Sequence, residues 1–153
     1  MRIVVAVVGK PRNAALATAI REYETRAARY WPLDVHEVRE ERASGSTAAV
    51  VTDREAARLR ERTDGARVIA CDPNGRSFTS EAFSAWLQQE RERGEDIAFV
   101  VGGAHGLSNG LLAESSLKLS LAPWTLPHEL ARLVLAEQLY RAGTIVRGEP
   151  YHK

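Results

Sequence analysis

Two short runs of apolar residues limit what this chain can fold into. Residues 3–8 read IVVAVV and residues 97–101 read IAFVV. Neither run alternates between apolar and polar residues, which is the pattern of a strand with one face in water. Continuous β-branched runs of this length are typical of strands covered on both faces. The sequence therefore predicts an α/β fold with a mainly parallel sheet between layers of helices.

The rest of the chain alternates between further strands and helices. We expect additional strands over 33–38, 66–71 and 117–121, and helices over 13–30, 48–62, 80–93, 108–116 and 128–142. The charged residues of 48–62 indicate a solvent-exposed helix face, and the DPNG sequence of residues 72–75 predicts a turn. The chain has 153 residues and no internal repeat or linker, so a single domain over 1–153 is expected.

Composition limits the kinds of binding partner and the cellular compartment that this chain fits. The formal net charge is +1, which lacks the basic excess of proteins that hold nucleic acid mainly through phosphates. An RNA partner would need a local patch, two copies of the chain, or recognition of shape. Cys71 is the only cysteine, so an intrachain disulfide is impossible. We expect no signal peptide, no membrane span and a cytoplasmic protein.

Two loops at strand ends are the candidate ligand site, because α/β proteins bind ligands there. The first contains Gly102, Gly103 and Gly106, directly after the strand at 97–101. Glycines let backbone approach a ligand closely, but they also serve plain chain reversal. The second loop, Ala122–Pro127, carries two prolines and Trp124. Its backbone could read an adenine edge, or it could be a rigid connector that packs Trp124 into the core.

The last helix and the tail raise a similar choice. The helix is apolar around most of its circumference, so it needs cover on most sides, either within the chain or from a second copy in a homodimer. The tail, Arg147–Lys153, contains Tyr151 and His152, which could stack on a base, or it could be a frayed end. The spacings of His105, His128 and His152 match no compact zinc pattern, so no metal is expected.

Taken together, these residues resemble the RNA large-subunit methyltransferase H family of the SPOUT class. The matching positions are Ile3–Lys10, Glu22–Tyr23, Asp72, Gly75, Phe99–Gly103, Gly106–Leu107, Thr125–His128, Arg132, Glu137–Ala142 and Arg147–Lys153. The resemblance covers essentially the whole chain and is most specific in its last third. It implies a trefoil-knotted α/β fold, a rare exception to the rule that chains do not thread loops. It also implies a homodimer packed through the knot.

The implied reaction is methylation of N3 of a pseudouridine in large-subunit ribosomal RNA, on the assembled ribosome, with S-adenosylmethionine as donor. The resemblance places the cofactor against Cys71, Gly103, Ala122, Pro123, Trp124, Thr125, Leu126 and Pro127. Many relatives have leucine where Cys71 stands, which implies an apolar contact.

Methyl transfer needs N3 aligned with the departing sulfur, and N3 must lose its proton. The candidate proton acceptors are His128 and Tyr151 with His152, and Arg141 or Arg147 could stabilise negative charge. We expect the tail to complete the site of the opposite subunit.

Three other functions fit the same residues. They are a related SPOUT enzyme acting on another RNA, a ribosome-binding dimer without activity, and a nucleotide-binding protein unrelated to RNA. Binding of S-adenosylmethionine would separate the third function from the others.

Overall fold

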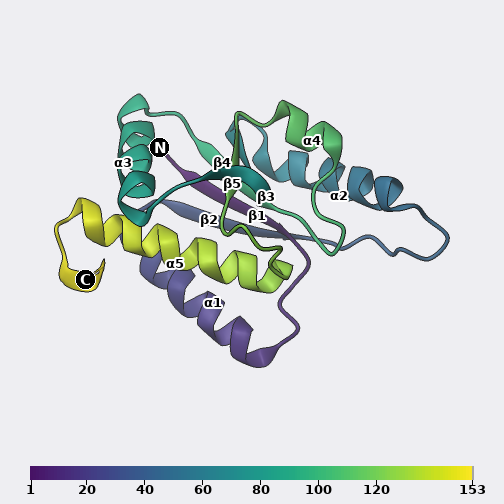
Figure 1. Ribbon diagram of the computed structural model, residues 1–153, viewed down its shortest axis with the longest axis horizontal. Coiled ribbons are helices and arrows are strands. Elements are labelled where there is room, and N and C mark those ends of the chain that lie inside the picture. Colours follow the sequence, from purple (N-terminus) through teal and green to yellow (C-terminus); the bar gives the residue numbers. More distant parts are fainter. Residues whose placement is uncertain (153) are drawn as a thin grey trace.

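The computed structural model describes residues 1–152 and has one five-stranded sheet with helices on both faces (Figure 1). The strands are β1 (Ile3–Val8), β2 (Leu33–Val38), β3 (Arg67–Ser77), β4 (Ile97–Val101) and β5 (Leu117–Ser120). The helices are α1 (Ala14–Ala27), α2 (Ala48–Thr63), α3 (Ser80–Arg93), α4 (Asn109–Glu114) and α5 (His128–Val146). A 3-10 turn, η1 (Pro150–His152), ends the described chain.

The sheet has the strand order β2-β1-β4-β3-β5, and every neighbouring pair is parallel. The two apolar runs became β1 and β4, which lie side by side near the centre and are buried at every residue. The predicted α/β fold with a parallel sheet is therefore confirmed. Because all strands run the same way, their carboxyl ends meet at one edge of the sheet.

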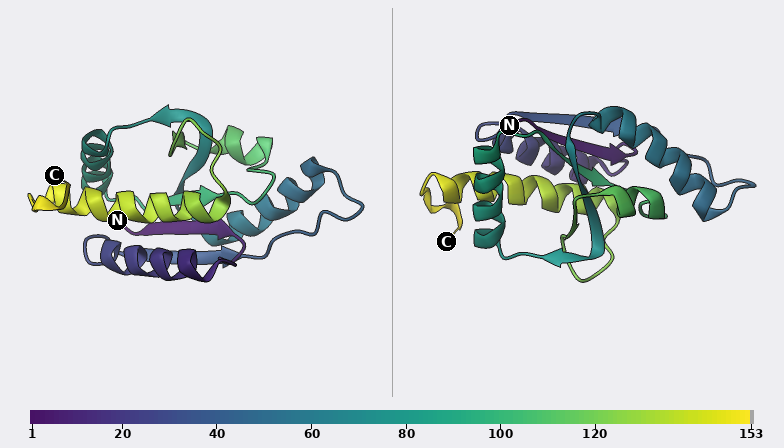
Figure 2. Two further views of the ribbon diagram at one scale, coloured as in Figure 1. Left: turned by 60° about the horizontal axis from the view of Figure 1, so that its bottom comes forward. Right: turned by 90° about the horizontal axis from the view of Figure 1, so that it is seen from above.

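Alternate residues of the central strands feed two hydrophobic cores, one on each face of the sheet. Val5 and Phe99 contribute to the core that also contains Leu135 and Leu139 of α5. The other core lies beneath α2 and α4 and includes Val8 and Val100. Helix α5 runs beside α1 and also packs against α3, as the views in Figures 1 and 2 show.

Most predicted element boundaries agree with the structure to within a few residues, with one clear error. Residues 72–75 were expected to form a turn, but β3 continues to Ser77. Cys71 and Arg76 both pair with Leu119, so residues 72–75 form a bulge that the strand accommodates. Helix α1 ends at Ala27, earlier than expected, and α5 continues to Val146, beyond the predicted end at residue 142.

No helix within residues 1–152 combines the length and the apolar character needed to span a membrane. The trefoil knot stays a prediction from the resemblance.

Candidate functional site

A cavity of about 450 Å³ opens at the carboxyl edge of the sheet, over the end of β4 and the bulge of β3. The loop after β5 and the first turns of α5 close it on the other side. Seven of the eight residues predicted to contact the cofactor line this one cavity: Cys71, Gly103, Ala122, Trp124, Thr125, Leu126 and Pro127. The eighth, Pro123, is not among the lining residues.

The glycine turn after β4 forms one wall of the cavity. The amide of Gly106 donates a hydrogen bond to the carbonyl of Gly103 at 3.0 Å, and Gly106 has a φ of +74°. A Cβ at Gly102 would lie 2.6 Å from the carbonyl carbon of Gly106. Glycine is therefore required for chain reversal here, and the same tight turn leaves backbone exposed to the cavity.

The loop of residues 122–127 forms the opposite wall. The hydroxyl of Ser120 donates a hydrogen bond to the carbonyl of Ala122 at 2.8 Å, which holds the start of the loop. The side chain of Trp124 is 79% exposed. The alternative in which this loop packs Trp124 into the core is therefore wrong, and the indole lies at the rim of the cavity.

Cys71 contributes an apolar surface to the cavity floor. Burial raises the pKa of the Cys71 thiol to about 12. The thiol therefore stays protonated at neutral pH and packs as a small apolar group rather than acting as a nucleophile.

His128 lies at the first position of α5 and lines the same cavity. Two side chains, Glu129 and Arg132, hold this end of the helix. Glu129 accepts a hydrogen bond from the amide of Arg12 at 2.6 Å. One turn further on, buried Arg132 forms ion pairs with Glu24 of α1 at 2.7 Å and Glu37 of β2 at 3.0 Å. The start of α5 is thus held against α1, β2 and the segment of Arg12.

The other three predicted catalytic residues lie further along α5 and in η1, which folds back onto it. Glu137 accepts hydrogen bonds from the guanidinium of Arg141, at 2.6 and 2.9 Å, and from the hydroxyl of Tyr151 at 3.1 Å. The ring of Tyr151 packs on Tyr140 with 4.5 Å between centroids. Nδ1 of His152 is buried and has no hydrogen-bond partner among residues 1–152.

The tail is therefore folded onto α5 as far as His152, so the alternative of a frayed end is wrong for residues 150–152. Lys153 lies outside the described residues. Burial raises the pKa of Tyr151, and hydrogen bonding to Glu137 raises it further. The phenol is a proton donor at neutral pH, so within this arrangement His128 and His152 are the better candidates for a proton acceptor.

The structure does not bring all four predicted catalytic residues together in one chain. His128 and Arg141 are thirteen positions apart on a continuous helix. At 1.5 Å per residue, that is about 20 Å along the axis. Figure 2 shows η1 beyond the C-terminal end of α5, whereas the cavity is lined by residues at the start of the helix.

Sequence reasoning missed a second, larger cavity of about 990 Å³ that adjoins the first at Ala104. It lies over the ends of β1 and β2 and contains Glu55 of α2, which is only 3% exposed. The expectation that the charged residues of 48–62 form a solvent-exposed face is wrong at this position. The signal was present, because Glu55 interrupts an apolar stripe between Val51 and Leu59 at helical spacing.

Among residues 1–152, His, Cys, Asp and Glu side chains form no group of three that could hold a metal ion.

With this geometry in place, comparison with known proteins defines the class. A family model described as Predicted SPOUT methyltransferase matches residues 1–152, and the chain belongs to this family. Two solved structures share the fold at low identity. A probable methylase family protein from Haemophilus influenzae Rd KW20 has a TM-score of 0.62 and 16% identity, covering 99% of this chain and 70% of that chain. A probable methyltransferase from Bordetella pertussis Tohama I has a TM-score of 0.53 and 13% identity, covering 92% and 95%.

Within that class, the curated relatives share one name, Ribosomal RNA large subunit methyltransferase H. The relative from Gemmatimonas aurantiaca is 58% identical over 100% of both chains. Relatives from Anaeromyxobacter sp. strain Fw109-5 and from Clostridium botulinum strain Langeland are 45% and 42% identical, again over 100% of both chains. The resemblance drawn from the sequence is confirmed, and the protein is a methyltransferase of the SPOUT family.

Proposed function

We propose that this protein transfers a methyl group from S-adenosylmethionine to N3 of a pseudouridine in large-subunit ribosomal RNA. It acts as a homodimer on the assembled ribosome, in the cytoplasm. The relatives named above are full-length matches, and their name supports a large-subunit RNA substrate. The observation that carries the proposal is the single cavity lined by seven residues expected, from the resemblance alone, to contact the cofactor.

The residues of this cavity fit an adenosyl cofactor. Its volume falls in the range of small-molecule sites. Leu121, Leu126 and Pro127 offer apolar surface, while the glycine turn and the loop 122–127 offer rigid backbone groups for an adenine edge. S-adenosylmethionine would supply an activated methyl group on a sulfonium. The first amides of α5 have no side-chain cap and border the cavity, where they would favour a carboxylate.

In the proposed reaction, the chain's own residues orient the base and receive its proton. We call the cavity of about 450 Å³, lined by the residues expected to contact the cofactor, the donor cavity. His128 lines this cavity and is therefore placed to accept the N3 proton. The guanidinium of Arg141, already ordered by Glu137, would stabilise the anion that forms on the base. These two roles require both ends of α5 at one site.

A dimer resolves the separation of about 20 Å along α5. If two copies of α5 pack side by side in opposite directions, a two-fold axis places the tail of each beside the donor cavity of the other. Leu130 and Val146, near the two ends of the helix, are each 37% exposed and could contribute to such packing. Because α1 and α3 already cover much of α5, the helix itself leaves less apolar surface for a partner than its sequence suggested.

The experiment is mass mapping of ribosomal RNA after incubation of purified protein with S-adenosylmethionine and ribosomes that lack the modification. We expect one added methyl on the base of a large-subunit pseudouridine, at N3. A methyl on another base, on a ribose or on another RNA would support the related SPOUT enzyme. Absence of any methyl on RNA would contradict enzymatic function.

A matched pair of variants connects this activity to the cavity. Ala122→Trp fills the cavity and should weaken S-adenosylmethionine binding by at least ~10-fold, equivalent to about 1.4 kcal/mol, with loss of methylation. Pro123→Ala, one residue along the same loop, should change binding by less than ~3-fold. Equal calorimetric affinities for the two variants would remove the cavity as the cofactor site.

A further inference from the structure

The larger cavity adjoins the donor cavity. The two share Ala104, and the turn after β1 approaches the start of α5 between them. A Cβ built at Gly9 would lie 3.7 Å from Nε2 of His128 and 3.9 Å from Oε2 of Glu40. A molecule in the larger cavity would therefore lie beside both His128 and the methyl donor.

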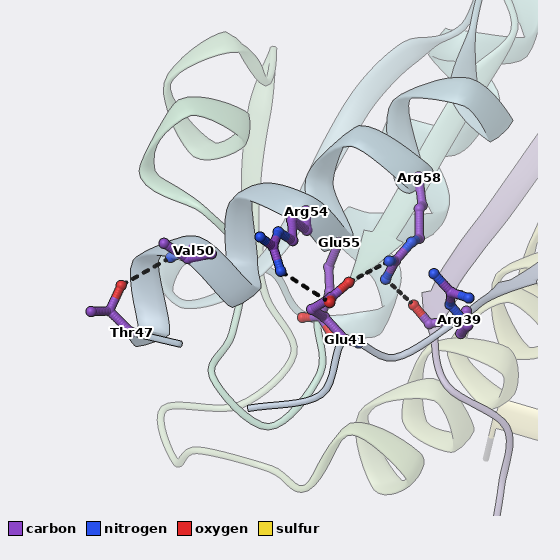
Figure 3. Close-up of polar contacts among 7 residues, drawn as sticks. All are labelled: Arg39, Glu41, Thr47, Val50, Arg54, Glu55 and Arg58. Carbon is purple, nitrogen blue, oxygen red and sulfur yellow. Dashed lines mark hydrogen bonds and ion pairs between the residues drawn. The ribbon is translucent and has the colours of Figure 1, made fainter. Parts of the chain in front are cut away.

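Glu55 forms the floor of this cavity and has one oxygen free. Its Oε2 accepts a hydrogen bond from the amide of Glu41 at 3.1 Å. Its Oε1 is buried and has no hydrogen-bond partner among the described residues. A Cβ built at Gly103 would lie 3.3 Å from Oε2 and 3.4 Å from Oε1, so both oxygens of the carboxylate lie against the glycine turn. Figure 3 shows Glu55 on the side of α2 that faces the segment of Glu41.

An unpartnered carboxylate oxygen here is costly for folding. The pKa of Glu55 is raised, mainly because burial disfavours the charged carboxylate. Glu40 also raises this pKa, while the amide of Glu41 and the charges of Arg58 and His105 lower it. Leaving a buried acceptor unsatisfied carries a desolvation penalty, which is larger for a charged group. Native proteins satisfy nearly all such groups, so a free oxygen beside a cavity is a natural acceptor for a hydrogen bond from water or from the N–H of a ligand.

The other acidic side chains that line the cavity already form ion pairs. Glu37 pairs with Arg132, and Glu40 pairs with Arg12 at 2.9 Å. Glu41 pairs with Arg54 at 3.4 Å and with Arg58, as the dashed lines in Figure 3 show. Glu55 is left as the acceptor for an incoming donor.

The exposed cations at the rim of the cavity differ from these acids in their ion pairing. Lys10, Arg39 and Arg42 line the cavity, and within residues 1–152 their side chains form no ion pair. The cavity thus combines three cations at its mouth with one hydrogen-bond acceptor at its floor. That combination matches a nucleotide, with its phosphate outside and an N–H of its base inside.

We propose that this cavity receives the target nucleotide, and that Oε1 of Glu55 accepts the N1–H of pseudouridine, which makes Glu55 a specificity-determining residue. This inference rests on the proposed function. In pseudouridine the sugar is attached through carbon, so N1 carries a hydrogen; in uridine, N1 carries the sugar and has none. With uridine in the cavity, Oε1 stays buried and unpaired. A site built to bond an N–H rejects an analogue that lacks it by far more than a shape difference would.

The test uses two kinds of unmethylated ribosome, one with pseudouridine and one with uridine at the target position. The measured quantity is the ratio of kcat/KM values for the two substrates. The wild type should prefer pseudouridine by at least ~100-fold. In Glu55→Gln, the side chain has a single oxygen, which accepts the hydrogen bond from the backbone amide of Glu41. Its NH₂ group then faces the base and cannot accept N1–H. The ratio should fall to within ~10-fold of unity, mainly through slower methylation of pseudouridine.

Two controls separate recognition from structure. Glu61→Gln is an exposed change on the same helix and should leave the ratio at the wild-type value. Calorimetric affinity of Glu55→Gln for S-adenosylmethionine should match the wild type, and its thermal midpoint should not fall below the wild-type value. A variant that keeps the full preference for pseudouridine would overturn the proposal.

The wild type gives a second, independent outcome. A wild type that methylates both ribosomes equally would also overturn the inference while leaving the methyltransferase function intact. A wild type inactive on both would contradict the function itself. If Glu55→Gln does not fold, the double variant Arg39→Ala/Arg42→Ala decides. This variant should raise KM for ribosomes and make KM less dependent on salt concentration. Unchanged values would exclude the rim as the place where the phosphate binds.

Discussion

Gly102 and Gly143 are glycines because another part of the chain occupies the space that a side chain would need. At Gly102 the neighbour is the backbone of Gly106, which gives the donor cavity its tight wall. At Gly143, inside α5, it is the ring of Tyr30, with 2.3 Å between the position of a Cβ and Cγ of the ring. Both contacts are steric requirements and do not depend on a bound ligand.

Replacing Gly143 by alanine tests this packing. The added methyl would push Tyr30 away from α5, and overpacking of this kind typically costs about 1–3 kcal/mol. The free energy of unfolding from urea titration should fall by that amount, although alanine has the higher helix propensity. Gly110→Ala on α4, where the Cβ would meet only a flexible Arg60 side chain at 3.5 Å, should be neutral or slightly stabilising. Equal effects at both positions would refute the account.

At the residue scale, the sequence identified the residues with unusual local chemistry and missed those that depend on distant neighbours. The prolines and glycines of the two loops predicted the donor cavity because rigid or reversing backbone has a local signature. Glu55 carries no such signature, since its free oxygen depends on Glu41 and the glycine turn, segments distant in sequence. Its place in the apolar stripe of α2 was the one available indication.

Among the elements, α5 carries most of the functional organisation. Its first turn borders the donor cavity, and its middle packs on α1 and α3 and holds the tail through Glu137. The apolar circumference of this helix predicted extensive cover but could not distinguish neighbours in the same chain from a partner. Similarly, the DPNG sequence favours a turn locally, whereas pairing of Cys71 and Arg76 with β5 on either side keeps residues 72–75 within β3 as a bulge.

Removing the tail should separate the functions of the two ends of α5. Deletion of residues 150–153 leaves the donor cavity intact, so calorimetric affinity for S-adenosylmethionine should stay within ~3-fold of the wild type. Methylation of ribosomes should fall by at least ~100-fold. Tyr151→Phe keeps the packing on Tyr140 but loses the hydrogen bond to Glu137, and should show an intermediate rate. Full activity of the deleted protein would exclude the tail from the site.

For the whole molecule, charge and topology together explain how a small, nearly neutral protein could act on RNA. A net charge of +1 gives little general attraction for nucleic acid, so recognition must come from local features and from shape. The parallel sheet gathers two adjoining cavities at one edge, and the ends of α5 lie far apart in each copy. The central claim is that a complete site needs the donor cavity of one subunit and the tail of the other.

Mixing two inactive variants tests that claim most directly. Ala122→Trp lacks a working donor cavity but keeps its tail, and the 150–153 deletion has the reverse defects. If sites are shared, each mixed dimer regains one of its two sites, and random exchange of subunits should restore about a quarter of wild-type methylation. Activity no higher than that of the separate variants, with mixed dimers demonstrated in the sample, would contradict the account.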